Sequence, residues 1–161
     1  MEDKKVDVYI EIERGSNQKY EWNKETGELE LDRVLNVPFV YPYAYGFIPH
    51  TFAEDGDELD VLVIDNEFIP RNSYKRVYIV GALLMEDEHG KDEKLLTVPE
   101  DVFASGEIRE LADLSSTILE SIQTFFANYK KNDPERWSRV YGFANKEHAV
   151  SLYDKYRACC V

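Results

Sequence analysis

The chain has 161 residues, the length of one ordinary domain, and its 43% apolar and 13% aromatic content is that of a globular protein with a hydrophobic core. Its net charge of −13, from 32 acidic and 19 basic residues, argues against a protein that coats nucleic acid or docks on an anionic membrane. Both of those surfaces are bound by a surplus of Lys and Arg. We therefore expect a single domain over residues 1–161, with neither nucleic-acid nor membrane partners, whose acidic groups attract cations or keep it soluble by self-repulsion.

The sequence favours a cytoplasmic location. The two cysteines, Cys159 and Cys160, are adjacent and near the C-terminus, a position that suits neither a disulfide framework nor a buried nucleophile. The charged start "MEDKKVDV" does not resemble a secretory signal, and the apolar run at 77–85 is too short to span a bilayer. The sequence assigns no role to the two cysteines.

The first two-thirds of the chain predicts β-structure. Residues 6–13 alternate β-branched and aromatic side chains with polar ones, the pattern of a half-buried strand. Residues 19–23 and 28–34 flank a turn that contains Gly27, and residues 75–86 and 93–99 flank a second turn, at 87–92, that contains Gly90. Each arrangement predicts a hairpin. Residues 61–64 read as a buried strand.

The last third of the chain changes to a helical period. Six apolar residues in the segment 116–131 fall on one helical face, namely Ile118, Leu119, Ile122, Phe125, Phe126 and Tyr129. Thr117 and Glu120 have the spacing of a capping box at the start of this helix, and a second helix is predicted at 146–157, after Gly142. Strands followed by helices predict an α+β fold, a small closed or nearly closed β-barrel with helices outside.

The stretch "EDGDELDVLVID" places three aspartates, Asp55, Asp57 and Asp60, directly before the buried strand. Like charges repel at short range, so a folded protein tolerates such crowding when a positive charge lies between them. A straight strand would point Asp60 away from the other two, whereas a loop bent at Gly56 can gather all three. The segment therefore predicts a cradle for a cation, with a solvated acidic loop as the alternative.

An EF-hand does not fit this stretch. Counted from Asp55, the fifth position is Leu59, the sixth is Asp60 where glycine is required, and the twelfth is Asn66 where glutamate is required.

A second pair of carboxylates strengthens the cation interpretation. Asp87 and Asp92 bracket the "EHGK" turn, so hairpin pairing would set them opposite each other, which destabilises a hairpin unless an ion compensates. A polar turn would explain this pair taken alone. Two acidic clusters, each at the end of an apolar strand, indicate a shared oxygen-lined site for which Mg²⁺ is the natural ion.

Four basic residues, Lys19, Arg33, Lys94 and Lys130, lie in or beside predicted elements, and each alone could be a surface charge. Together with the phenols of Tyr41, Tyr45 and Tyr129 they suit phosphate oxygens, the common ligand that also binds Mg²⁺. The chain has neither a P-loop nor a GxGxxG motif, so side chains and metals would have to hold the phosphate.

Five segments together resemble a known family. They are Glu11 with "KYE" (19–21) and "DR" (32–33), "YPYAYGFIPHT" (41–51), "DGDELDVLV" (55–63), "MEDEHGKDEKLLTVP" (85–99) and "FFANYKK" (125–131). In this order they resemble the soluble family I inorganic pyrophosphatases, over roughly residues 7–143. The resemblance implies an OB-like five-stranded β-barrel with flanking α-helices, and hydrolysis of pyrophosphate to two orthophosphates by several Mg²⁺ ions. It also implies a homo-oligomer, a hexamer in bacterial relatives of this length.

The resemblance also implies a role for each matching residue. It implies that Asp55, Asp60 and Asp92 ligate the tightest metal, that Asp60 bridges to a second, and that Asp57 is the general base. The metals that arrive with the substrate would be held by Asp87 with Asp92, and reached through water by Glu11. The implied phosphate-binding residues are Lys19, Arg33, Tyr45, Lys94, Tyr129 and Lys130, with Glu21 and Tyr41 in support.

Two positions depart from the family pattern. Glu13 stands where many relatives have proline, and Glu58 stands where "DGDPLD" is the commoner form. Glu58 would add negative charge near the metals, so the choice between Mg²⁺ and Mn²⁺ or another divalent ion stays open.

Our hypothesis for the reaction is that a water bridging two metals loses a proton to Asp57 and becomes hydroxide. This hydroxide would then attack one phosphorus in line. Two other functions stay open at this point. One is a non-catalytic OB-like module that holds a nucleotide or a partner, and the other is a phosphohydrolase for a larger phosphoanhydride or ester.

Overall fold

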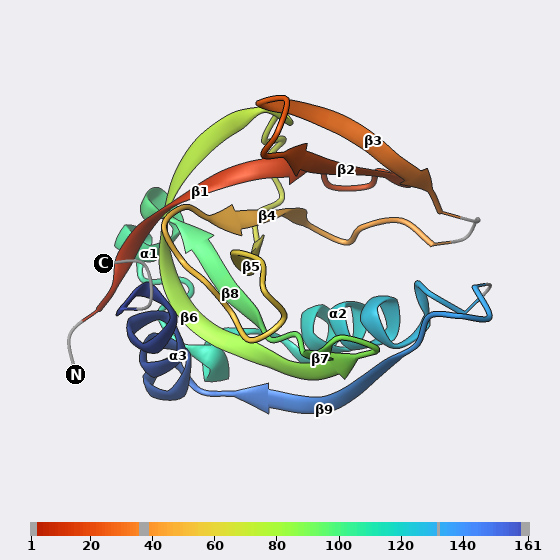
Figure 1. Cartoon of the computed structure of the whole chain (residues 1–161). Helices are drawn as coiled ribbons and strands as arrows, with labels where there is room; N and C mark the ends of the chain where they lie inside the picture. The colour runs from red at the N-terminus through yellow and green to blue at the C-terminus, as the bar shows by residue number, and fades with distance from the viewer. Residues whose placement is uncertain (1–2, 36–38, 132, 159–161) are drawn as a thin grey trace.

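The computed structural model describes residues 3–35, 39–131 and 133–158, and Cys159 and Cys160 lie outside the described residues. The strands are β1 (Lys5–Ile12), β2 (Gln18–Asn23), β3 (Glu28–Val34), β4 (Ala44–Ile48), β5 (Leu59–Val63), β6 (Ser73–Asp87), β7 (Gly90–Lys91), β8 (Lys94–Pro99) and β9 (Ser138–Ala144). The helices are α1 (Glu100–Ser105), α2 (Ser116–Asn128) and α3 (Lys146–Ala158), with a short 3₁₀ turn at Leu111–Asp113 (Figure 1). None of the described helices is long and apolar enough to cross a membrane.

Five strands form a closed ring. The pairing runs β1-β4-β5-β8-β6, and β6 also pairs with β1, which closes the barrel. The 15-residue strand β6 closes the ring because its first half pairs with β1 and its middle pairs with β8, while its last residues pair with β9 outside the ring (Figure 1). Strands β2 and β3 form a separate two-stranded sheet. The predicted α+β fold with an OB-like five-stranded barrel is confirmed.

The parallel pair β5 and β8 is buried on both faces, which explains its nearly continuous apolar sequence. Leu62 packs in a core cluster that includes Phe126 of α2. Val61 and Val63 point the other way, into a second cluster that includes Ala149 of α3. Strand β5, which directly follows the acidic stretch, therefore packs into one core cluster with α2 on one face and into another with α3 on the other face.

Strand β4 crosses β1 at a point where only glycine fits. A Cβ atom on Gly46 would lie 1.8 Å from the carbonyl oxygen of Tyr9. Glycine therefore allows β4, the strand that carries Tyr45, to lie close against β1.

Both predicted helices are present, but the capping box was wrong. The N-cap of α2 is Ser115, whose backbone is extended and whose hydroxyl accepts from the Ile118 N–H at 3.2 Å. Thr117 lies within the first helical turn and cannot cap it. Helix α2 ends at Asn128, earlier than predicted, and α3 matches the predicted span closely.

The second hairpin has a different register from the predicted one. Asp87 pairs with Gly90 across a two-residue turn, and the Asp92 N–H donates to the Met85 carbonyl at 3.0 Å. Asp87 and Asp92 are therefore not opposite each other, because the turn is two residues shorter than the sequence pattern indicated. Strands β4 and β9 and helix α1 were not predicted.

Candidate active site

The acidic loop between β4 and β5 is held by the hydroxyl of Thr51. This buried hydroxyl donates to the Ile48 carbonyl at 2.6 Å and accepts from the Leu59 N–H at 2.8 Å. It thereby ties the two ends of the loop together. Gly56, with φ of 90°, makes the bend between Asp55 and Asp57 that the sequence required.

Lys94 lies between two of the carboxylates. Asp60 of β5 and Lys94 of β8 are register partners, and the ammonium of Lys94 lies 2.7 Å from Asp60 and 2.9 Å from Asp92. Lys94 is 2% exposed. Burial would lower the pKa of Lys94, but the attraction to Asp60 and Asp92 outweighs it and raises that pKa well above its ordinary value. The buried lysine is therefore charged.

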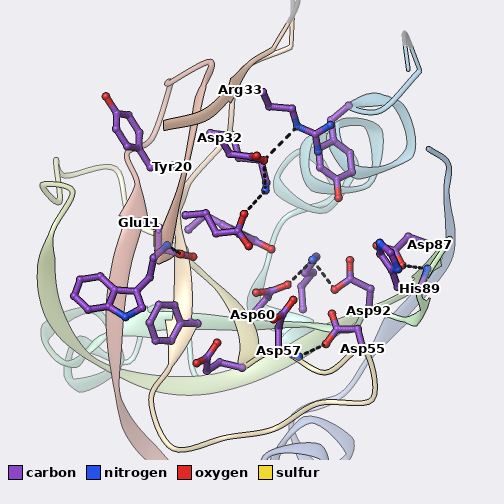
Figure 2. A pocket seen from close by; sticks show the side chains of 18 of the residues that line it. Glu11, Tyr20, Asp32, Arg33, Asp55, Asp57, Asp60, Asp87, His89 and Asp92 are labelled. Atoms are coloured by element: carbon purple, nitrogen blue, oxygen red, sulfur yellow. Dashed lines mark hydrogen bonds and ion pairs between the residues drawn. The ribbon is translucent and has the colours of Figure 1, made fainter. Parts of the chain in front are cut away.

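Asp55, Asp60 and Asp92 converge on one point. One carboxylate oxygen of each lies within 4.8 Å of the others, and Figure 2 shows the three side chains turned toward one another. Burial raises the pKa of Asp55 to about 6 and that of Asp60 to about 7, against the opposing pull of Lys94. A further positive charge would stabilise the ionised form of these carboxylates at neutral pH, so the three aspartates suit a divalent metal.

A second ion-paired cluster stands beside this trio. Lys130, which follows α2, lies 3.0 Å from Asp87 and 3.2 Å from Glu88. Asp87 and Lys130 are both buried. The Asp87 carboxylate also accepts from the His89 N–H at 2.8 Å, which fixes the tight turn (Figure 2). The end of α2 is thus joined to the β6–β7 turn.

The β2–β3 hairpin presents two cations side by side. Lys19 and Arg33 are register partners, and like charges placed opposite each other repel. Asp32 relieves the repulsion, because its carboxylate lies 3.0 Å from Lys19 and 3.9 Å from Arg33. Within the described residues, the buried Nε of Arg33 has no hydrogen-bond partner. This donor suits an incoming anion.

Glu11 lies at the base of the same hairpin. It is buried and accepts from the Trp22 N–H at 2.9 Å. Burial raises the pKa of Glu11 to about 8, with a smaller contribution from Asp60. Burial also raises the pKa values of the phenols of Tyr41, Tyr45 and Tyr129, which therefore stay protonated and can donate hydrogen bonds.

All these groups line one cavity of about 290 Å³. The structure brings together all fourteen site residues named from the sequence, which are Glu11, Lys19, Glu21, Arg33, Tyr41, Tyr45, Asp55, Asp57, Asp60, Asp87, Asp92, Lys94, Tyr129 and Lys130. Their individual roles stay predictions.

Nine lining residues carried no role in the sequence analysis: Tyr20, Trp22, Lys24, Asp32, Phe47, Glu58, Glu88, His89 and Arg136. Several of them are next in the chain to residues with a predicted role, and this adjacency was the signal by which the sequence could have identified them. Glu58 was noted as a departure from the family pattern, and its carboxylate lies 3.1 Å from Lys24 in the hairpin turn. The charge added by Glu58 is thus balanced by a lysine from another element.

The charge of the cavity wall fits divalent cations. Among the described residues that line the cavity, ten side chains are acidic and six are Lys or Arg, so this wall carries more negative than positive charge. An anionic ligand would be repelled by this excess unless cations accompanied it. Carboxylate oxygens are the donors that hard divalent ions prefer. The residues present therefore fit a metal-assisted site for an anion.

Comparison with known proteins agrees with this chemistry. A family model described as inorganic pyrophosphatase matches residues 8–159. The inorganic pyrophosphatase of Helicobacter pylori strain J99 is 43% identical over 150 residues, which cover 92% of this chain and 87% of that protein. The one from Saccharolobus solfataricus is 38% identical over 152 residues, which cover 93% and 88% of the two chains.

Solved structures show the same relation. The structure of an inorganic pyrophosphatase from Helicobacter pylori superposes with a TM-score of 0.92 at 39% identity, over 99% of this chain and 97% of that one. The Thermus thermophilus structure gives a TM-score of 0.92 at 37% identity, over 96% and 90%.

Proposed function

This chain belongs to the family I inorganic pyrophosphatases and is an inorganic diphosphatase, and from this premise we propose that it hydrolyses pyrophosphate with several Mg²⁺ ions held by its carboxylate wall. The observation that carries the proposal is the convergence of Asp55, Asp60 and Asp92 within 4.8 Å, in a cavity also lined by four Lys and two Arg side chains. Acids would hold the metals, and the basic side chains would hold the phosphate oxygens.

The proposed metal ligands are Asp55, Asp60 and Asp92 for the tightest ion, with Asp87 and Glu11 toward the ions that accompany the substrate. Bound Mg²⁺ would neutralise phosphate charge and lower the pKa of water, so that a nucleophile is available near neutral pH. Lys94 lines the same cavity, where its two ion pairs hold Asp60 and Asp92 in place and its charge is proposed to help bind phosphate.

Asp57 is the proposed general base. It is exposed, unlike Asp87 and Asp92, and its backbone N–H donates to the Asp55 carboxylate at 3.1 Å. This hydrogen bond sets the loop so that the Asp57 side chain stands beside the proposed metal ligands while remaining open to solvent (Figure 2). From there it can accept a proton from the attacking water.

The opposite wall is proposed to bind the two phosphoryl groups. Lys19 and Arg33 from the hairpin, and Lys130 after α2, supply positive charge where negative charge develops on the leaving phosphate. Tyr45 and Tyr129 would donate hydrogen bonds, with Tyr41 and Glu21 in support. No covalent intermediate is required, so no Ser, Cys or His nucleophile is needed.

An orthophosphate-release assay tests the proposal. The purified protein is incubated with Mg²⁺ and, in separate reactions, with pyrophosphate, ATP or a phosphomonoester. We expect rapid release from pyrophosphate and far slower release from the other two. Faster release from ATP or the monoester would indicate a broader phosphohydrolase, and no release from any substrate would indicate a binding module.

The choice of Mg²⁺ over Mn²⁺ is part of the proposal. Repeating the pyrophosphate assay with each ion decides it. We expect the higher turnover with Mg²⁺, as the family resemblance implies, and not from the ligand type, because carboxylate oxygens suit both ions.

Self-association is a further part of the proposal. Large apolar side chains are exposed at several places, among them Leu31, Val34, Phe52, Phe68, Trp137 and Tyr141. Such side chains suit contacts with further copies of the chain. Light scattering coupled to size exclusion would give the mass of the particle, which we expect to be a hexamer. The single-domain organisation, the cytoplasmic location and the lack of nucleic-acid and membrane partners stay predictions from the sequence.

A further inference from the structure

The last turn of α3 touches both segments that carry the proposed tightest-metal ligands. One is the β4–β5 loop, which carries Asp55, and the other is the segment between β7 and β8, which carries Asp92. These segments are brought together in the fold although they are far apart in the chain. The residue of α3 that contacts both is Tyr156.

Tyr156 makes one hydrogen bond to each segment. Its hydroxyl donates to the carboxylate of Glu93 at 2.6 Å, and Glu93 is the residue directly after Asp92. Its backbone carbonyl accepts from the Phe52 N–H at 3.2 Å, at the start of the acidic loop. A single residue thus bridges the two segments whose carboxylates, Asp55 and Asp92, must converge.

Packing holds Tyr156 in this position. It is 2% exposed and belongs to the core cluster that contains Leu59 and Leu95, which lie beside Asp60 and Lys94. Next to it, Lys155 lies 3.4 Å from Glu54, one residue before Asp55. The bridge therefore rests on a rigid, buried side chain and not on a mobile surface contact.

We propose that Tyr156 is a positioning residue that sets the separation of Asp55 and Asp92 and thereby tunes metal affinity. The inference rests on the proposed function, because it takes those two residues as metal ligands. Tyr156 lies outside the cavity wall and acts through Glu93 and the loop at Phe52.

The test is Tyr156→Phe, which keeps the buried ring and removes the hydroxyl. One readout is the Mg²⁺ dissociation constant of the substrate-free protein, measured by isothermal titration calorimetry and expected to change in parallel with the second. The second is the Mg²⁺ concentration for half-maximal pyrophosphatase activity, together with kcat at saturating Mg²⁺. We expect that concentration to rise about 3- to 10-fold, the effect of losing one hydrogen bond in the support of a ligand. We expect kcat at saturating metal to stay within about twofold, since extra Mg²⁺ restores the site.

Two further variants sharpen the result. Glu93→Ala removes the other partner of the same hydrogen bond, so the double variant should be no worse than either single one. Tyr153→Phe is the matched control, because Tyr153 lies one turn earlier on α3 and its ring contacts Lys4 and Arg157. It should leave the Mg²⁺ dependence unchanged.

The outcomes separate this inference from the proposed function. An unchanged Mg²⁺ dependence in Tyr156→Phe, or a loss of kcat alone, would overturn the positioning role, because a merely structural defect lowers the active fraction without moving metal affinity. Asp60→Asn in the same series reports on the metal site itself. If Asp60→Asn shifts the Mg²⁺ dependence and Tyr156→Phe does not, the inference fails and the proposed function stands.

Discussion

The two walls of the cavity are built in different ways. The carboxylate wall grows out of the barrel: Asp60 lies on β5 with Lys94 as its register partner, and its loop is tied down by Thr51. The opposite wall uses the two-stranded β2–β3 sheet, which is outside the ring, and the residues that end α2. The hairpin is joined to the barrel through Glu11 and a Tyr9–Trp22 ring contact at 5.4 Å.

This difference indicates that metal affinity and substrate affinity are separable properties. A closed ladder with buried charges keeps the metal ligands in place before any ligand arrives. The hairpin is tied to that wall at two points, because Glu11 accepts from the Trp22 N–H at 2.9 Å and Lys24 lies 3.1 Å from Glu58. We therefore expect the two affinities to be separable at hairpin residues outside these ties, such as Lys19. Variants at such residues should change one affinity and spare the other.

The largest effect is expected at Asp57, which belongs to the acidic loop but not to the proposed metal ligands. Asp57→Asn should lower kcat by about two to four decades, the usual loss on removing a general base. Its Mg²⁺ dependence should stay close to that of the parent protein. Asp101→Asn, exposed on α1 away from the cavity, is the matched control. Parent-like turnover in Asp57→Asn would remove Asp57 from the proposed role.

The next largest effect is expected at Asp60 on the carboxylate wall. Asp60→Asn should raise the Mg²⁺ concentration for half-maximal activity by about 10- to 100-fold, because a charged ligand is replaced by a neutral one. Lys94 keeps its contact with Asp92 at 2.9 Å, so the fold should survive. Metal-titrated activity and circular dichroism check both points. An unmoved titration would exclude Asp60 as a ligand.

On the opposite wall, Lys19→Met should act on the substrate and not on the metal. We expect KM for magnesium pyrophosphate to rise about 10-fold, the size of one charge-assisted hydrogen bond of about 1.5 kcal/mol. The Mg²⁺ dependence at saturating substrate should not move. If both quantities changed together, the two walls would not be separable.

The smallest effect concerns stability and pH. Burial raises the pKa of Asp60 to about 7 and that of Glu11 to about 8. Without metal the folded state therefore binds protons more tightly than the unfolded state, and these groups lower the free energy of unfolding as pH rises from about 4 to 8. Mg²⁺ favours the charged carboxylates, so the rise in Tm on adding Mg²⁺ should be larger at pH 8 than at pH 5.5. Thermal unfolding with and without Mg²⁺, at both pH values and constant ionic strength, measures this rise in Tm. A rise that is equal or larger at pH 5.5 would contradict the expected pH dependence.

Much of the fold was predictable because its patterns are local. The alternation at 6–13, the apolar run at 61–64 and the helical spacing in α2 and α3 each depend on near neighbours in the chain. Strand β4 was missed because it has only five residues, carries a glycine in its middle and lies between Pro42 and Pro49. Its glycine is explained only by the approach of Tyr9 from another strand. The capping box was wrong because two serines precede Thr117 and the extended residue is the first of them.

The site was predictable as a set of residues and not as a network of contacts. The spacing of Asp55, Asp57 and Asp60 around Gly56 implied a bend, and the bend is present. The register of the second hairpin was wrong, so Asp87 and Asp92 do not face each other. Asp92 meets Asp55 and Asp60 instead, from the segment that leads into β8.

What the sequence by itself determined was the identity of the acidic and basic groups and the local bends that expose them, because bends and strand faces depend on a few consecutive residues. What only the tertiary structure decided was which charges meet. Lys94 reaches Asp60 across 34 positions through the pairing of β5 with β8, and Tyr156 reaches Glu93 across 63 positions through the packing of α3 on the barrel core. Pairing of this kind depends on how distant strands align, and no local pattern encodes that alignment.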